Sequence, residues 1–291
     1  MRKIILLLIF VNLLFGKAKW IAYKETLFIG EPIIPILCYK NDTPSPKEVE
    51  DIPPTIFSFY TICNGNKYVI PQSIFELLTK IDTITIFPGE SVYIIEAPFF
   101  YSDFCLIKPK AGINYNTRLP FKYGKFTIYI PSRFFEEGTD SIILYFKEPP
   151  KGKEEFFEFI KHLSYWSGEE ENDPNSPKLK ELAEKYKDTL LLTFIFRNYV
   201  NNVPYTKVEG EKIKWRDLKE VYSEKEKRLI KMKKIFPNHI FTEELEFDIC
   251  MGYLFAQPNK GYELYKELKK KYPYNYYIKR IENRIKELKR K

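Results

Sequence analysis

Histidine is almost absent from this chain, with His162 and His239 the only two among 291 residues. So few histidines argue against a catalytic zinc centre, because His is its commonest ligand. The four cysteines also lack a Cys-x-x-Cys pair, so a structural zinc site has no support; they are Cys38, Cys63, Cys105 and Cys250. One disulfide at most can form among the first three, and buried free thiols are the open alternative. The sequence predicts no metal and no cofactor.

The motifs that mark common enzyme classes are missing as well. The chain has no His-Glu-x-x-His, no Gly-x-Ser-x-Gly, no phosphate-binding glycine loop and no dinucleotide-binding glycine fingerprint. A thiol nucleophile and its base could be imagined from Cys250 and His239. However, Cys250 lies between Ile249 and Met251, which favours a packed thiol. We therefore expect no catalytic residues and a protein that is not an enzyme.

Long apolar runs are also rare, and the one at 4–15 stands at the N-terminus. Two basic residues precede this run, and the small residues Gly16 and Ala18 follow it. This order is typical of a secretory signal peptide over residues 1–18. The run is short for a membrane span, which takes about 20 residues. We expect cleavage, export to the periplasm or cell surface and no transmembrane segment afterwards; a retained anchor is the alternative.

Residues 19–150 consist of short stretches with a β-strand pattern, separated by Pro, Gly, Asn and Asp. β-branched and aromatic residues dominate these stretches, as expected of strands. They are Ile33–Tyr39, Ile56–Cys63, Thr83–Phe87, Val92–Ile95, Phe126–Ile130 and Ile142–Phe146. A turn is expected at Asn64-Gly65-Asn66, and one helical stretch at Pro71–Lys80. About seven such strands predict an antiparallel β-sandwich of immunoglobulin type.

Helical spacing replaces this alternation after Pro149–Gly152, so residues 151–291 are predicted to be α-helical. Ser223 with Glu226 reads as a capping box that opens one helix, and residues 201–210 read as a loop. The expected helices are Glu154–Leu163, Pro177–Asn198, Ser223–Phe236, Thr242–Gln257, Lys260–Tyr272 and Tyr274–Arg290, with an acidic loop at Ser167–Asn175. The whole chain is thus expected to be an α+β, two-domain protein.

A weak internal repeat lies within the helical region. Five positions recur at a constant offset of 36: Leu229, Met232, Phe236, Pro237 and Ile240 match Tyr265, Leu268, Tyr272, Pro273 and Tyr276. In both copies a helix closes on an aromatic-Pro pair. Paired helices with a period in the mid-thirties are typical of helical-hairpin repeats.

The first region resembles the immunoglobulin-like domains of secreted bacterial proteins. The stretch Phe28–Ile33, with its Gly-Glu-Pro, followed by Asn41, is similar to the opening of those domains. The turn Pro88–Ser91 and the hairpin Leu119–Ile130 resemble later parts of them, and Ser141–Phe146 with Glu148-Pro149 resembles their last strand. This resemblance implies a spacer or docking domain without catalytic residues.

The second region resembles tetratricopeptide repeats. Gly261, Tyr265 and Pro273 match the small, aromatic and Pro positions of that motif's second helix, whereas Leu268 departs from it. The resemblance implies stacked helical hairpins that bind a protein partner.

Positive charge is concentrated at the C-terminus. Residues 19–150 include 13 basic and 15 acidic residues. Residues 151–291 include 31 basic and 24 acidic residues, which gives this region a net charge of +7. Within 260–291 alone there are 12 basic and 4 acidic residues. An apolar stripe (Ile278, Ile281, Ile285, Leu288) occupies one side of the last helix, so the charge is expected on the solvent side. A solvated Lys-rich face is the alternative to a binding face.

The candidate binding residues all lie near the C-terminus; they are Lys279, Arg280, Arg284, Tyr274, Tyr276 and Tyr277. We expect a non-catalytic interaction or scaffold protein of the cell envelope, which binds a protein partner through its helical region. Two alternatives are a module that binds carbohydrate or an anionic polymer or membrane surface, and a hydrolase with an unrecognised site. Export argues against nucleic acid as the partner.

Overall fold

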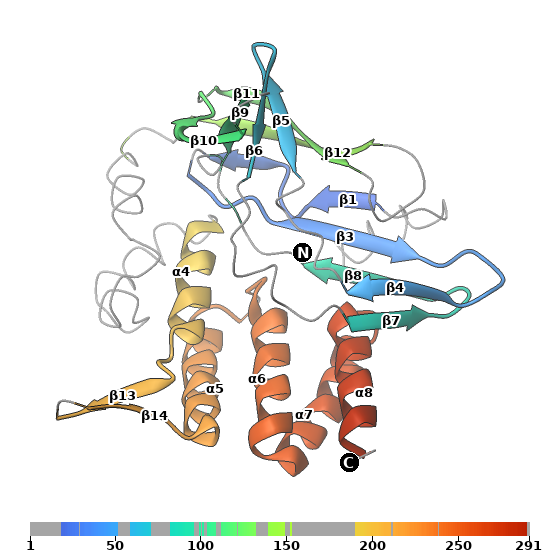
Figure 1. Cartoon of the computed structure of the whole chain (residues 1–291), viewed down its shortest axis with the longest axis vertical. Coiled ribbons are helices and arrows are strands. Elements are labelled where there is room, and N and C mark those ends of the chain that lie inside the picture. Colours follow the sequence, from blue (N-terminus) through green and yellow to red (C-terminus); the bar gives the residue numbers. More distant parts are fainter. Residues whose placement is uncertain are drawn as a thin grey trace. The chain divides into compact units, whose positions relative to one another are not determined.

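The computed structural model shows a mixed α+β protein (Figure 1). It describes residues 19–28, 30–51, 59–70, 82–95, 99, 101, 104–108, 112–120, 122–131, 139–148, 152, 190–210, 212–237 and 239–289. The chain forms two compact units: the β unit contains 1–151 and 274–280, and the helical unit contains 152–273 and 281–291. The expected α+β class is confirmed, and Tyr274–Arg280, which the sequence placed in the helical region, belongs to the β unit.

The largest sheet of the β unit has seven strands in the order β10-β9-β6-β5-β11-β12-β2. Their bounds are β2 Thr26–Phe28, β5 Tyr60–Cys63, β6 Asn66–Val69, β9 Cys105–Lys108, β10 Gly112–Arg118, β11 Gly124–Pro131 and β12 Thr139–Lys147. All neighbours are antiparallel except β12 and β2. The predicted turn is confirmed, because Asn64 and Gly65 take φ of 49° and 75° between paired Cys63 and Asn66.

Two smaller sheets complete the strands of the β unit. One has the order β1-β3-β8, with β1 Lys19–Ala22, β3 Pro35–Lys40 and β8 Ser91–Ile95; the other pairs β4 Lys47–Asp51 with β7 Asp82–Ile86. Tyr276 packs into a buried cluster with Tyr39, Ile86 and Val92. The expected helix Pro71–Lys80 lies outside the described residues.

Alternation of side chains builds the core of the β unit. On β11, Phe126, Ile128 and Ile130 are buried, while on β12 Ile143 and Tyr145 are 42% and 46% exposed. The buried rings contact one another edge to face, as aromatic pairs prefer; these rings include Trp20, Phe59, Phe99, Phe104, Phe126 and Phe146. Apolar contact therefore dominates this core.

The helical unit contains α4 Leu190–Asn201, α5 Leu218–Ile235, α6 Thr242–Ala256 and α7 Pro258–Lys271, with the hairpin β13 Thr206–Glu209 and β14 Lys212–Trp215. Helix α8 (Tyr276–Lys289) contributes its residues from Ile281 onward. Helix α6 packs against both α5 and α7. The start of α6 at Thr242 is as predicted.

Two details of the helical unit differ from the prediction. Helix α5 begins five residues before Ser223, because the Asp217 side chain accepts the N–H of Lys219 and caps the earlier end. Residues 201–210 are not a plain loop, since they include β13. The expected helix 154–163 and the acidic loop 167–175 lie outside the described residues.

Candidate functional site

Three helices of the helical unit meet around one pocket, and their ends are fixed by local signals. Asp217 caps α5, and Pro258 occupies the first turn of α7, where its missing N–H costs nothing. Helices α5 and α7 end alike: the N–H groups of Phe236 and Tyr272 each donate 2.8 Å to the carbonyl four residues earlier. Positions 36 residues apart thus stop both helices in the same conformation.

Gly261 allows α7 to approach α6 closely. A Cβ atom at this position would lie 2.5 Å from the backbone nitrogen of Leu254 and 2.8 Å from its Cα. Those are backbone atoms, which cannot move aside. The carbonyl oxygen of Gly261 also accepts a hydrogen bond from the thiol of Cys250, with Sγ and O 3.4 Å apart. Only glycine fits here, so this residue sets the separation of two walls of the pocket.

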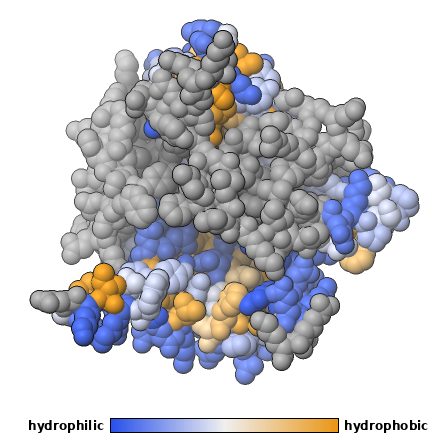
Figure 2. Space-filling view, in the orientation of Figure 1, coloured by the Kyte–Doolittle hydropathy of each residue, from blue (hydrophilic) through white to orange (hydrophobic). Residues whose placement is uncertain are grey.

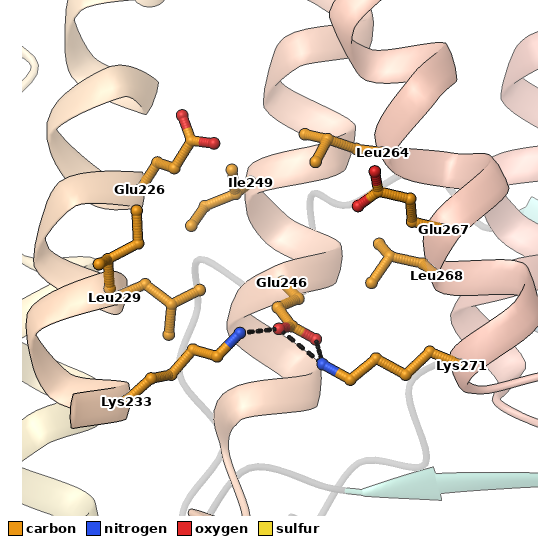
Figure 3. A pocket seen from close by; sticks show the side chains of 10 residues that line it. Glu226, Leu229, Lys233, Glu246, Ile249, Leu264, Glu267, Leu268 and Lys271 are labelled. Atoms are coloured by element: carbon orange, nitrogen blue, oxygen red, sulfur yellow. Dashed lines mark hydrogen bonds and ion pairs between the residues drawn. The ribbon is translucent and has the colours of Figure 1, made fainter. Parts of the chain in front are cut away.

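The pocket has a volume of about 240 Å³, and we call it the helix pocket. Its lining comes from i, i+3, i+4 and i+7 positions on α5 and α7 and from α6 between them (Figure 3). The lining residues are Glu226, Leu229, Ile230, Lys233, Glu246, Ile249, Leu264, Glu267, Leu268 and Lys271. Five of these side chains are aliphatic and five are charged.

Glu246 on α6 ties the three helices together at one end of the helix pocket (Figure 3). It accepts 2.6 Å from Lys233 of α5, 2.8 Å from Lys271 of α7 and 2.9 Å from the hydroxyl of Tyr272. Burial raises the pKa of Glu246, but the hydrogen bonds and charges of the two lysines outweigh it, so this pKa lies below its usual value. The carboxylate stays ionised and fully partnered, which suits a structural clamp rather than an acid catalyst.

Similar clamps recur elsewhere in the helical unit. Glu226 accepts from the hydroxyl of Tyr253 and from Lys260, and Glu282 accepts from the hydroxyl of Tyr265 at 3.0 Å and from Lys269 at 2.7 Å. In each case one carboxylate takes both a tyrosine hydroxyl and a lysine. This arrangement neutralises charge within the unit.

The imagined thiol nucleophile has no reactive geometry. Burial raises the pKa of Cys250 to about 12, so the thiol stays protonated at neutral pH. His239 is buried and its Nδ1 accepts the N–H of Phe241 at 3.0 Å. All four cysteines are free thiols. Within the described part of the chain, no three His, Cys, Asp or Glu side chains gather where they could hold a metal ion.

The predicted basic residues do not form one open patch. Lys279, in the β unit, forms an ion pair with Glu90 at 2.9 Å and lies over the Phe87 ring. Arg284, in the helical unit, pairs with Glu287 at 2.7 Å and stacks 4.1 Å from the Phe255 ring. Arg280 is half-buried. Intramolecular partners therefore already hold Lys279 and Arg284, and their role in binding an anion stays a prediction.

The predicted tyrosines differ in exposure. Tyr274 is 46% exposed and Tyr277 is half-buried, but Tyr276 is only 4% exposed. Tyr276 therefore presents no exposed ring to a ligand, because its ring fills the cluster with Tyr39 and Val92. The apolar stripe of α8 is buried at Ile278 and Ile281. The helix pocket itself was not predicted, although its helical 3–4 spacing on successive helices was the signal that could have indicated it.

No helix among the described residues is long and apolar enough to cross a bilayer. The predicted signal peptide, residues 1–18, lies outside the described residues. Its cleavage or retention therefore stays a prediction.

No protein-family model matches the chain, and no curated protein matches it. A solved β-glucosidase from Erythrobacter marinus superposes with a TM-score of 0.28 and 9% identity, over 44% of this chain and 15% of that one. An alkylpurine DNA glycosylase from Pseudomonas fluorescens has a TM-score of 0.25 and 10% identity, over 45% of this chain and 31% of that one. A β-glucosidase from Listeria innocua has a TM-score of 0.25 and 11% identity, over 46% of this chain and 16% of that one. The chain spans less than a third of each, and likeness this small assigns neither fold nor activity.

Proposed function

We propose that this chain is a non-catalytic interaction protein that binds a protein partner in the helix pocket. The observation that carries the proposal is an aliphatic pocket of about 240 Å³ whose charged neighbour, Glu246, is already neutralised by Lys233 and Lys271. Binding of an apolar side chain to the five aliphatic residues of this pocket gains free energy by removing apolar surface from water. A groove between helices that takes apolar anchors is a recurrent mode of peptide recognition.

The shape of the helix pocket suggests one aliphatic or aromatic anchor on the partner. Leu229, Ile249 and Leu268 are buried and form a fixed floor, while Ile230 is 52% exposed at the mouth. Glu267 stands beside this floor, away from the Glu246 clamp (Figure 3). Its charge favours a basic residue next to the anchor on the partner.

The finer architecture belongs to the same proposal. We interpret the β unit as an immunoglobulin-like sandwich that spaces or docks the protein, and α5–α8 as tetratricopeptide-like hairpins. The alternation on β11 and β12 and the shared helix ends at Phe236 and Tyr272 support this interpretation. From the signal-like order of residues 1–18 we propose that the protein acts in the cell envelope, either in the periplasm or at the surface.

Peptide selection tests the pocket directly. Random peptides displayed on phage would be selected against the full chain, and the selected peptides measured by calorimetry. We expect an apolar anchor with a neighbouring Lys or Arg, and at least a tenfold loss of affinity in Ile230→Asp. Ile62→Asp is the matched control, since Ile62 is 57% exposed on β5. Peptides that bind both variants equally, or no enrichment at all, would contradict the proposal.

A second candidate function, carbohydrate binding, is favoured by one observation on the largest sheet. Tyr60 and Tyr129 stack with ring centroids 5.3 Å apart, and Lys67 Nζ lies 4.1 Å from the centroid of the Tyr60 ring. Tyr129 pairs across to Ser141, a small exposed residue. Aromatic rings at a sheet surface suit a sugar, since pyranose C–H groups stack on aromatic faces.

A glycan array with the full chain tests this second function. We expect binding that falls at least tenfold in Tyr129→Ala and is retained in Tyr123→Ala, a similar side chain that is 43% exposed on a turn. Absence of any bound glycan, or equal binding by both variants, would remove this candidate and leave the peptide pocket unaffected.

A further inference from the structure

The most exposed large apolar side chains in the described residues lie on one small hairpin. Val208 and Ile213 are each 74% exposed, and Trp215 is 81% exposed. All three belong to β13 and β14, which extend sideways beside α4 and α5 in the helical unit (Figure 1). Apolar side chains gather over this hairpin at the lower left of the surface (Figure 2). Isolated surface apolar residues are ordinary, but a contiguous set this exposed marks a contact site.

The register of the hairpin puts its apolar residues on one face. Val208 is paired with Ile213, and Thr206 with Trp215, so these four side chains share a side. Lys207 is paired with Lys214, and Glu209 with Lys212, on the opposite side. The hairpin is therefore amphipathic over its whole length.

The hairpin is also held firmly at both ends. At its tip, Gly210 takes φ of 61° in a two-residue loop, which a side chain would disfavour. At its base, Arg216 donates 2.7 Å to Glu224 of α5 and 3.2 Å to the carbonyl of Pro204. Glu224 is held in turn by Arg228 at 2.7 Å. The apolar face is thus presented by a fixed element, although nothing in the described residues covers it.

We propose that this hairpin is a membrane-surface anchor whose apolar face inserts into an anionic lipid bilayer. Trp is the side chain most suited to the bilayer interface, and here it stands at the edge of an Ile–Val face. On the other face Lys207 and Lys214 pair with Glu209 at 2.7 and 2.6 Å. Lys212 lies on the same face, and its long flexible stem can reach round a two-stranded hairpin to lipid headgroups. The net charge of +7 over 151–291 complements an anionic surface.

A second copy of the chain is a weaker fit to the same face. The three large side chains offer much less area than the roughly 800 Å² per partner of a stable interface. Insertion into lipid has no such threshold, since it gains from each apolar group separately. The area thus favours lipid over self-association, and the inference does not depend on the helix pocket.

Vesicle binding by the full chain tests the anchor. The probe is a vesicle of phosphatidylglycerol and phosphatidylcholine in equal parts, measured by co-sedimentation. We expect Ile213→Ser with Trp215→Ser to weaken binding at least tenfold, without any change in net charge. Ile62→Ser, at a side chain that is 57% exposed in the β unit, should bind within twofold of the original chain. Equal binding by the double variant would overturn the proposal, because charge alone would then explain attachment.

Two further measurements separate insertion from other causes. Vesicles should shift tryptophan emission to shorter wavelength in the original chain but not in Trp215→Phe, which keeps an apolar ring and should stay bound. Light scattering after gel filtration gives the oligomeric state. A dimer that dissociates in the double variant would show that a second copy covers the face, and that result would also overturn the proposal. Circular dichroism should be unchanged, since both substituted side chains are exposed.

Discussion

The two units of this protein differ in the contacts that stand out inside each of them. In the β unit, edge-to-face rings such as Phe99, Phe104 and Phe126 fill the core. In the helical unit, carboxylates such as Glu226, Glu246 and Glu282 each collect a lysine and a tyrosine hydroxyl from neighbouring helices. Apolar packing is insensitive to pH and salt, whereas charged hydrogen bonds depend on both. The comparison therefore predicts two units with different sensitivities.

The largest effect is expected in the apolar core. Phe104 is fully buried between Phe99 and Phe126, and Phe104→Ala should cost about 3–5 kcal/mol of unfolding free energy through the cavity it leaves. Hydrogen exchange should show the lost protection in peptides of the β unit. The loss should be the same at pH 7 and pH 4. An equal loss from Ile62→Ala, on the exposed side of β5, would contradict the packing argument.

In the helical unit, the largest loss of unfolding free energy is expected where α7 approaches α6 most closely, at Gly261. Gly261→Ala should cost about 1–3 kcal/mol, because the added Cβ meets the backbone of Leu254. Gly252→Ala is the comparison, because the nearest atoms to its added Cβ belong to the side chain of Tyr222 and not to backbone. Chemical denaturation of both variants checks the order. A larger cost at Gly252 would show that the side-chain contact, and not the backbone, limits the packing.

The Glu246 clamp gives the expected acid sensitivity. Its folded-state pKa is lowered, so its contribution is fully present above the ordinary value of 4.5 and is lost as pH falls through the folded value. Glu246→Gln should cost about 1–2 kcal/mol at pH 7, and the difference from the original chain should shrink below pH 4. Urea unfolding at pH 7 and pH 3 measures both. A difference that stays constant with pH would rule out the carboxylate charge as the cause.

The smallest effect concerns Lys279. Lys279 is paired with Glu90, so Lys279→Glu would place two carboxylates together. We expect a loss of about 0.5–1 kcal/mol, as for a partly exposed pair. The double swap Glu90→Lys with Lys279→Glu should restore the melting temperature; failure to restore it would assign the loss to the Phe87 contact instead.

Elements with a strong burial pattern were predictable from sequence, and elements without one were not. Strands β11 and β12 alternate because one face is buried, and α6 begins at the expected Thr242. The hairpin β13–β14 was missed because Val208 and Ile213 face solvent, so no core imposed a readable pattern on their neighbours. The helix pocket was missed because its lining is divided among three helices, and their approach depends on tertiary packing at Gly261.

The return of the chain at Tyr274–Arg280 orders events during synthesis. Tyr276 completes the cluster of Tyr39, Ile86 and Val92, and the N–H of Tyr93 donates 3.1 Å to the carbonyl of Tyr274. A nascent chain emerges from the ribosome N-terminus first, so the β unit must wait for its last segment until residues 152–273 of the helical unit have been made. The unit whose synthesis begins first is thus completed only about ten residues before the helical unit, and a ribosome stalled before Tyr274 would hold a β unit that lacks part of its buried cluster.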